Sequence, residues 1–184
     1  GAWIQESTLN MREHLGEELF RKLMFILSER MYITHLTNAS AKLPLMGHFI
    51  SYRESLINWC PIGRLASDED RQRFIEIDQE RQIREVNIGV LARSSLAEKV
   101  CFAMGGNTSI DIYPRGWDKT YALNHYDNYE HWFVGDRCTL PTGNDKPLYD
   151  KIKETNPNHA FEVKTTSDTI AIIEDIIATL NSKE

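Results

Sequence analysis

The sequence has few cysteines and fewer basic than acidic residues. Its three cysteines, Cys60, Cys101 and Cys138, are odd in number and widely spaced, a pattern that fits neither a disulfide framework nor a paired-cysteine metal site. The formal net charge is -6, which argues against a nucleic-acid partner or an anionic membrane surface, because such partners require an excess of Lys and Arg. Any anion-binding site is therefore expected to be a local cluster of basic residues.

Long apolar runs are also missing. No stretch approaches the length of a membrane span, and the N-terminus lacks the basic-then-apolar order of a signal peptide, so we expect a cytoplasmic protein without a membrane partner. The 184 residues are 41% hydrophobic and 26% charged, which is typical of a compact globular protein. The chain opens with Gly1-Ala2 and no initiator methionine, and we expect a fragment of a longer protein.

Helical and strand-like patterns succeed one another in the first part of the chain. Leucines four residues apart predict a long amphipathic helix within residues 11–31. Aromatic and branched residues at 49–62 predict two strands joined by a tight turn at Glu54-Ser55. Ser67, followed by three acids, predicts a helix N-terminus, and helical structure with one break is expected to about residue 96. Two short strands are expected next, at 100–104 and 109–113.

The pattern changes near Arg115 to an alternation of helix and strand. A helix is expected at 118–124, and strands are expected at 132–134 and 161–164. The first of these strands ends at Gly135-Asp136, the pattern of a buried strand that delivers an acid to a loop. Ser167 predicts the cap of a terminal helix, and its buried stripe would consist of Ile170, Ile173, Ile177 and Leu180. We therefore predict an α+β domain at 1–114 and an α/β-type domain at 115–184.

Three arginines of the first domain form a candidate anion site. Arg53 lies in the first expected hairpin strand, Arg64 closes the sequence PIGR, and Arg71 lies one turn inside the helix capped by Ser67. A guanidinium group offers a planar fork that binds two phosphate oxygens at once, which lysine cannot do. Any one of these arginines alone is better explained as an ordinary solvated surface residue.

Polar side chains share one face of the expected strand at 109–113. Alternation places Ser109, Asp111 and Tyr113 on one side and two isoleucines on the other. A hydroxyl and a carboxylate on one side suit the hydroxyl groups of a sugar, although a half-exposed strand with a solvated face would have the same pattern.

Acidic and amide side chains of the second domain suggest a cation site. Asp136 follows a strand end, and Asn144 and Asp145 end a glycine-containing loop. Oxygen ligands on such a loop suit Mg²⁺, which usually shares its coordination shell with water and substrate phosphate. Lys119 is a candidate for neutralising a transferring phosphoryl group. A Gly-Asp turn and a lone lysine are also common surface features.

Four segments stand out when they are considered together. They are GHFISYRESLINWCPIGR at 47–64, SDEDR at 67–71, GGNTSIDIYPRGWDKTYAL at 105–123 and GDRCTLPTGND at 135–145. In this order they resemble the eukaryotic phosphomannomutases of the haloacid dehalogenase superfamily, and the similarity covers nearly the whole chain.

The resemblance implies a fold and a set of roles. Residues 1–114 would form an inserted α+β cap, an antiparallel sheet with helices, and residues 115–184 the C-terminal part of an α/β Rossmann-like core. The three arginines would hold substrate phosphate, and Ser109 and Asp111 would bind the hexose phosphate. Lys119 would be the phosphate-neutralising lysine and Asp136 a Mg²⁺ ligand. Asn144 and Asp145 would support the metal site without binding the ion themselves.

The family reaction interconverts mannose 6-phosphate and mannose 1-phosphate, the source of GDP-mannose for glycosylation, through a hexose 1,6-bisphosphate and an aspartyl-phosphate. Its nucleophile belongs to a DxDxT/V motif, which these 184 residues do not contain, so the polypeptide alone is expected not to turn over. The family's caps dimerise, which implies a homodimer through the cap. Two alternatives are a related sugar phosphatase and a non-catalytic module that binds sugar phosphate or dimerises.

Overall fold

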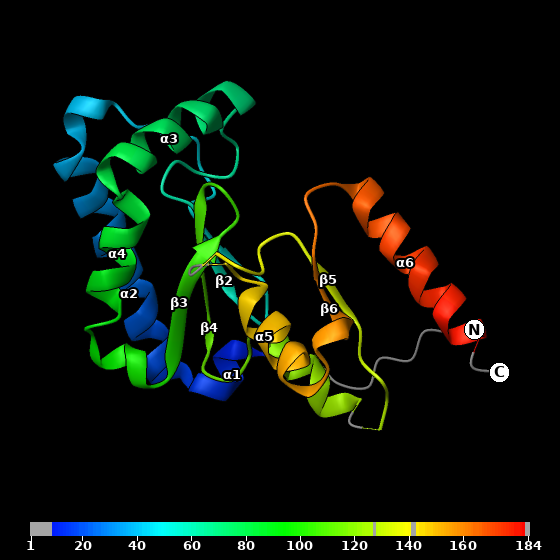
Figure 1. Ribbon diagram of the computed structural model, residues 1–184. Coiled ribbons are helices and arrows are strands. Elements are labelled where there is room, and N and C mark those ends of the chain that lie inside the picture. The colour runs from blue at the N-terminus through cyan, green and yellow to red at the C-terminus, as the bar shows by residue number, and fades with distance from the viewer. Residues whose placement is uncertain (1–8, 127, 141–142, 183–184) are drawn as a thin grey trace. The chain divides into compact units, whose positions relative to one another are not determined.

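The computed structural model describes residues 9–126, 128–140 and 143–182. The chain divides into two compact units, Gly1–Trp117 and Asp118–Glu184; the predicted boundary followed residue 114. The first unit combines helices with a four-stranded antiparallel sheet, and the second contains a two-stranded parallel sheet with helices (Figure 1). The expected combination of helices with an antiparallel sheet in the first unit is therefore observed.

The sheet of the first unit has the strand order β1-β2-β4-β3, with every neighbouring pair antiparallel. Its strands are β1 (Ile50–Tyr52), β2 (Ile57–Trp59), β3 (Val100–Gly105) and β4 (Ser109–Pro114). The predicted hairpin is confirmed: β1 pairs with β2, and Glu54 in the turn has φ +59°. The two strands expected at 100–104 and 109–113 are also confirmed and pair with each other.

The helices of the first unit largely follow the predicted pattern. They are α1 (Met11–Leu15), α2 (Glu17–Thr37), α3 (Asp68–Arg81) and α4 (Ile83–Leu91), with short 3-10 helices η1 (Ala39–Ala41) and η2 (Ser95–Glu98). The single helix expected within 11–31 is wrong in its continuity, because Gly16 adopts φ +79° and separates α1 from α2. The cap at Ser67 is confirmed, since its Oγ accepts the N–H of Asp70 at 3.1 Å. The predicted break occurs at Gln82, which has φ +52°.

The two faces of this sheet differ in polarity. Ile57 and Trp59 on β2 are opposite Ile112 and Ile110 on β4, and all four are fully buried. They belong to one core cluster with Leu23 and Leu27 of α2 and Leu91 of α4, two helices that lie beside the sheet in Figure 1. The other face carries a row in which Ser51, Asn58 and Asp111 are opposite one another. Because residues in register share a face, the polar row lies on the side away from that core.

The second unit contains short elements around its parallel pair of strands. They are η3 (Lys119–His125), β5 (Phe133–Gly135), α5 (Lys146–Thr155), η4 (Pro157–His159), β6 (Ala160–Glu162) and α6 (Thr166–Asn181). The helix expected at 118–124 is a 3-10 helix, and the strand expected at 161–164 ends at Glu162. The strand before Asp136 was expected to be buried, but β5 is only half-buried, because β6 alone pairs with it among the described residues.

The terminal helix forms where expected, but two details differ. Its N-cap is Thr165 instead of Ser167. The Thr165 side chain accepts the backbone N–H of Asp168, and the Asp168 side chain accepts the backbone N–H of Thr165, which together form a capping box. Ser167 cannot form such a pair, because the residue three positions after it is Ile170. The isoleucine and leucine stripe is 40–53% exposed instead of buried. The stripe therefore contributes little to the core of the described structure.

Among the residues described, none of the helices combines the length and apolar character needed to cross a membrane. All three cysteines are free, in agreement with the sequence analysis. Burial, with Asp145 and Glu162 nearby, raises the pKa of the Cys138 thiol to about 11, so this buried thiol is neutral at physiological pH.

Candidate functional site

Arg64 and Asp111 are joined by an asparagine on the polar face of the sheet. Arg64 Nη1 donates to Asn58 Oδ1 at 2.9 Å, and Asn58 Nδ2 donates to Asp111 Oδ1 at 2.6 Å. Asn58 is only 4% exposed, and both ends of its amide are engaged, so its orientation is fixed. It holds a guanidinium group and a carboxylate at a defined separation.

Asn58 was missed in the sequence analysis. The signal that could have found it is alternation, because Asn58 is the polar residue between Ile57 and Trp59 in a strand. A buried amide at such a position is normally retained only with hydrogen-bond partners on the same face.

Arg71 lies in the first turn of α3 and bonds to the loop that precedes this helix. Its Nη2 donates to the backbone oxygen of Arg64 at 2.6 Å, and its Nε donates to that of Ala66 at 3.1 Å. Its Nη1 donates to Thr108 Oγ1 at 3.2 Å, and Thr108 is 6% exposed. Arg71 therefore shapes the loop that carries Arg64 and connects it to the β3–β4 turn. Thr108 is a second residue that sequence reasoning missed.

Arg53 is placed differently from the prediction. It follows β1 instead of lying within it, because β1 ends at Tyr52, and its side chain is exposed. Its N–H donates to the backbone oxygen of Leu56 at 2.8 Å, which closes the hairpin. Alternation assigns Arg53 to the face of Ser51 and hence to the polar row. The structure thus joins Arg64 and Arg71 directly and leaves Arg53 in the exposed turn.

The position of Arg64 depends on a close approach between two glycines. Gly63 has φ +84°, and a Cβ atom built on it would lie 2.2 Å from the backbone oxygen of Gly47. Arg64 N donates to the His48 oxygen at 3.4 Å, and Met46 N to the Ile62 oxygen at 3.0 Å. The sequence PIGR therefore requires glycine for both its backbone conformation and its close contact with Gly47, in the segment before β1.

Ser109 and Asp111 share the polar face of β4, as alternation predicted. Ser109 Oγ donates to the Gly105 oxygen at 2.8 Å, so the hydroxyl proton is engaged while the oxygen can still accept. A Cβ atom at Gly105 would lie 2.7 Å from Asp111 Oδ1, which shows that the carboxylate lies against the backbone of β3. Glycine at position 105 provides the space for it.

Lys119 and Asp145 form an ion pair in the second unit. Lys119 Nζ contacts Asp145 Oδ1, and Asp145 Oδ2 accepts the backbone N–H groups of Asp136 and Arg137 at 3.2 and 3.1 Å. Burial opposes ionisation of this carboxyl, but the hydrogen bond and charge of Lys119 and the Arg137 N–H outweigh it and hold the pKa of Asp145 below its ordinary value. Asp145 thus fixes the start of the loop that follows β5. Asn144 is half-buried and directly precedes it.

Glu162 at the end of β6 holds the next part of the same loop. Its Oε1 accepts the backbone N–H groups of Cys138 and Thr139 at 3.0 and 2.9 Å, and its Oε2 accepts the Thr139 hydroxyl at 2.6 Å. These bonds, led by that from the hydroxyl, lower the pKa of Glu162. Two carboxylates therefore bind four successive N–H groups after β5. Sequence reasoning missed Glu162, because it is far from the loop in sequence.

Comparison with known proteins gives the context of these two sites. A family model described as eukaryotic phosphomannomutase matches residues 4–179. The chain belongs to the eukaryotic phosphomannomutase family. It is 34% identical over 174 residues to a phosphomannomutase of Drosophila melanogaster and 35% identical over 166 residues to one of Saccharomyces cerevisiae. It is 31% identical over 170 residues to phosphomannomutase 2 of Dictyostelium discoideum.

The three alignments cover 91%, 88% and 90% of this chain. They cover 63%, 61% and 64% of the respective relatives. The chain therefore spans less than two thirds of the length of these phosphomannomutases. The resemblance stated from PIGR, SIDIYPRGWDK and GD…GND is confirmed by the family match, which includes all three motifs.

The fit of a magnesium ion to this phosphomannomutase-family chain can be tested on the loop after β5. Within residues 9–126, 128–140 and 143–182, no group of three or more His, Cys, Asp or Glu side chains could hold a metal. Both carboxylate oxygens of Asp145 are engaged, by Lys119 and by backbone N–H groups. Asp136, the other acidic residue of this loop, directly follows β5.

The Lys119–Asp145 pair predicts an acid-sensitive second unit. A carboxyl whose pKa is lower in the folded than in the unfolded state stabilises the fold above its ordinary pKa, and this contribution disappears as the pH falls through the folded value. We expect the substitution Lys119→Met to lower the free energy of unfolding of this unit by about 1–2 kcal/mol at pH 7, since the lysine is half exposed and partly screened. Urea unfolding at pH 7, 5, 4 and 3, followed through amide signals of β5, measures this.

The same titration supplies its own control. Once the pH has fallen below the lowered pKa of Asp145 in the folded wild-type protein, wild type and variant should converge, because Asp145 is then protonated in both. An equal difference between the two proteins at pH 7 and pH 3 would show that Lys119 acts through packing and not through its charge.

Proposed function

We propose that this chain supplies the phosphosugar-binding cap and part of the haloacid dehalogenase-type core of a phosphomannomutase. Such an enzyme interconverts mannose 6-phosphate and mannose 1-phosphate through a hexose 1,6-bisphosphate and an aspartyl-phosphate. The observation that carries the proposal is the fixed row Arg64–Asn58–Asp111. It holds a phosphate-binding group and a hydroxyl-binding group on one side of one sheet.

Phosphate recognition is assigned to the arginines. Arg64 uses one arm of its guanidinium on Asn58, and the planar fork leaves further N–H groups for phosphate oxygens. Arg71 contributes charge and keeps the Arg64 loop closed. Arg53 extends the basic row along the same face.

Sugar recognition is assigned to β4. The Asp111 carboxylate accepts hydrogen bonds from hexose hydroxyl groups, and the Ser109 oxygen accepts one more while its proton is held by Gly105. Hydrogen bonds to an ionised acceptor are stronger than those between neutral groups. Asp111 is therefore expected to contribute most to discrimination between hexose phosphates.

The second unit is assigned to the phosphoryl group. Asp136 would hold Mg²⁺ as one carboxylate ligand, and the ion would supply positive charge to the phosphoryl oxygens. Lys119 adds a cation that is held in place by Asp145. Asn144 and Asp145 support the loop that carries Asp136 and do not ligate the ion themselves.

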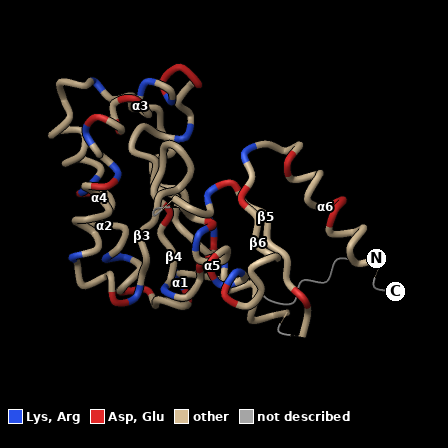
Figure 2. The backbone as a smooth tube through the Cα atoms, in the orientation of Figure 1, with Lys and Arg blue, Asp and Glu red and all other residues tan. Residues whose placement is uncertain are grey.

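The proposal includes the assembly of the protein and its partners. The partners are hexose phosphates and a second copy of the chain bound through the cap. Acidic and basic residues both occur along α3 (Figure 2). Light scattering after size-exclusion chromatography measures the assembly, and a monomer at all concentrations would contradict it.

A second candidate function is a non-catalytic module that binds hexose phosphate. The row Arg64–Asn58–Asp111 supports this function as well, because binding of a hexose phosphate requires no nucleophile. A related sugar phosphatase is distinguished from a mutase by its product, since it releases phosphate instead of returning it to the sugar.

Calorimetry and a turnover assay on the same 184-residue chain test these functions. We expect mannose 1-phosphate to bind, with at least about tenfold higher affinity than inorganic phosphate or mannose alone, because one good hydrogen bond to a charged group is worth about 1.5 kcal/mol. We expect neither isomerisation nor phosphate release, since the aspartate nucleophile is absent. If the folded chain binds none of the three ligands, the proposed phosphosugar site is refuted. If it releases phosphate from mannose 1-phosphate, the phosphatase alternative is supported instead of the mutase.

A further inference from the structure

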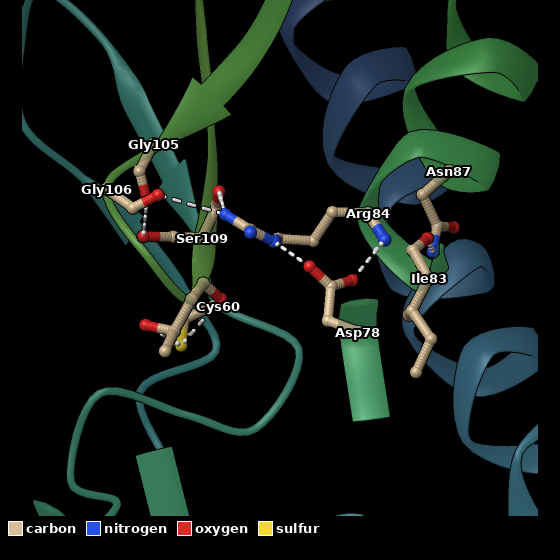
Figure 3. Close-up of polar contacts among 9 residues, drawn as sticks. Cys60, Asp78, Ile83, Arg84, Asn87, Gly105, Gly106 and Ser109 are labelled. Carbon is tan, nitrogen blue, oxygen red and sulfur yellow. Dashed lines mark hydrogen bonds and ion pairs between the residues drawn. The ribbon is translucent and has the colours of Figure 1, made fainter. Parts of the chain in front are cut away.

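A buried ion pair joins the junction of α3 and α4 to the turn between β3 and β4. Arg84 Nε donates to Asp78 Oδ2 at 2.7 Å, and only 13% and 8% of the two side chains are exposed. Arg84 Nη1 donates to the backbone oxygens of Gly106 at 3.0 Å and Ser109 at 3.3 Å. Figure 3 shows the guanidinium lying between the Asp78 carboxylate and this turn.

Asp78 also organises the junction itself. Its Oδ1 accepts the backbone N–H of Arg84 at 2.9 Å, and its backbone oxygen accepts the N–H of Gln82 at 2.8 Å. Gln82, the N-cap residue of α4, makes no capping bond with its side chain. One carboxylate therefore caps the start of α4 and orients the arginine that follows.

Stability alone is a weak reason for this arrangement. A cation in the first turn of a helix opposes the helix dipole. Taking an arginine and an aspartate out of water costs about as much as their attraction returns, so such pairs often fix a geometry instead of adding stability. The geometry fixed here is that of the turn that opens β4, because Arg84 binds carbonyl groups at both ends of Gly106–Ser109.

That turn carries groups of the proposed phosphosugar site. Ser109 itself bonds back to Gly105, Thr108 accepts a hydrogen bond from Arg71, and Asp111 lies two residues further along β4. We propose that Arg84, oriented by Asp78, is a positioning residue that fixes the β3–β4 turn so that Ser109 and Asp111 meet the hexose. The expected effect on hexose binding rests on the proposed function. The role of Arg84 in fixing the turn does not.

Substitution of Arg84 by lysine tests the positioning role. Lysine keeps the charge but cannot bind Asp78 and two carbonyl groups with one planar fork. We expect amide hydrogens at 106–111 to exchange at least about tenfold faster in Arg84→Lys, with those of β1 unchanged, because the turn opens locally. Affinity for mannose 1-phosphate should fall about tenfold or more, and affinity for inorganic phosphate about threefold or less, since the latter needs no hydroxyl acceptors.

Matched variants separate positioning from general destabilisation. Arg81→Lys, on the same stretch of chain but bonded to Ser40, should leave exchange and affinity unchanged. Leu23→Val in the core should lower the melting temperature without changing affinity at 15 °C. If Arg84→Lys does not fold, Asp78→Asn, which can still accept the Arg84 N–H, should show the same changes at smaller size.

The outcomes distinguish the two proposals. Unchanged exchange at 106–111 in a folded Arg84→Lys or Asp78→Asn protein would overturn the positioning role, whatever the ligand result. Faster exchange with wild-type affinity for mannose 1-phosphate would also overturn it, because the turn would then not serve the sugar. Failure of the wild-type chain to bind mannose 1-phosphate would instead refute the proposed function.

Discussion

The substitution Arg64→Ala is expected to weaken binding of mannose 1-phosphate at least about 100-fold, because hydrogen bonds from a charged donor contribute about 1.5–3 kcal/mol each and a guanidinium group makes two to phosphate. The change also removes the donor that fixes Asn58, at 2.9 Å from Arg64 Nη1. Asn58 would then be free to rotate, and its bond to Asp111 would weaken. The variant therefore affects both the phosphate and the sugar side of the site. Calorimetric titration of the folded chain measures the loss.

Two companion variants make this test specific. Arg64→Lys keeps the charge without the fork, and we expect an intermediate loss of about tenfold. Arg81→Ala removes a guanidinium group from α3 that bonds to Ser40 outside the site and should bind as wild type does. If Arg64→Ala retained wild-type affinity, the polar face of the sheet would not be the phosphosugar site.

Replacing Gly63 by alanine is expected to destabilise the first unit by roughly 3 kcal/mol, since left-handed backbone costs an alanine about 1–2 kcal/mol and overpacking costs about 1–3 kcal/mol. The added Cβ would lie 2.2 Å from the Gly47 oxygen, a backbone atom that cannot rotate away. The loop must shift to relieve this contact, and Arg64 shifts with it. Chemical denaturation measures the stability, and titration with mannose 1-phosphate measures the expected loss of affinity.

Gly116 provides the matched control for Gly63. It has φ +88°, yet a Cβ atom there would have nothing within 4 Å. Gly116→Ala should therefore show the conformational cost alone, about 1–2 kcal/mol, with unchanged affinity. Equal effects of the two substitutions would mean that the approach of Gly63 to Gly47 does not matter.

Local sequence signals predicted much of the fold. The alternation in β4 correctly separated Ile110 and Ile112, which are buried, from Asp111, because side chains in a strand point to opposite faces whatever surrounds them. The cap at Ser67 and the hairpin at Glu54 were equally predictable, since both depend on neighbouring residues in the chain.

Signals that depend on context were less reliable. Gly16 interrupts the first helix although the leucine period continues across it, because one residue at φ +79° is enough to break the hydrogen-bond ladder. Thr165 and Ser167 are both good caps by composition, and the reciprocal bond with Asp168 selected Thr165. The stripe of α6 has the period of a buried face. Periodicity shows that the side chains share one face of the helix, but it does not show whether another element packs on that face.

The sequence by itself determined the family, the strand faces and the residue types available for phosphate and sugar, because these depend on motifs and on the two-residue period of a strand. Only the tertiary structure decided that Arg64 and Asp111 meet through Asn58, that Lys119 is held by Asp145, and that Arg84 binds the β3–β4 turn. Apart from the bond between Arg64 and Asn58, these contacts join residues more than 20 positions apart in the chain. Hydrogen bonds require separations near 3 Å and defined angles, and no spacing along a sequence specifies such geometry between separate elements.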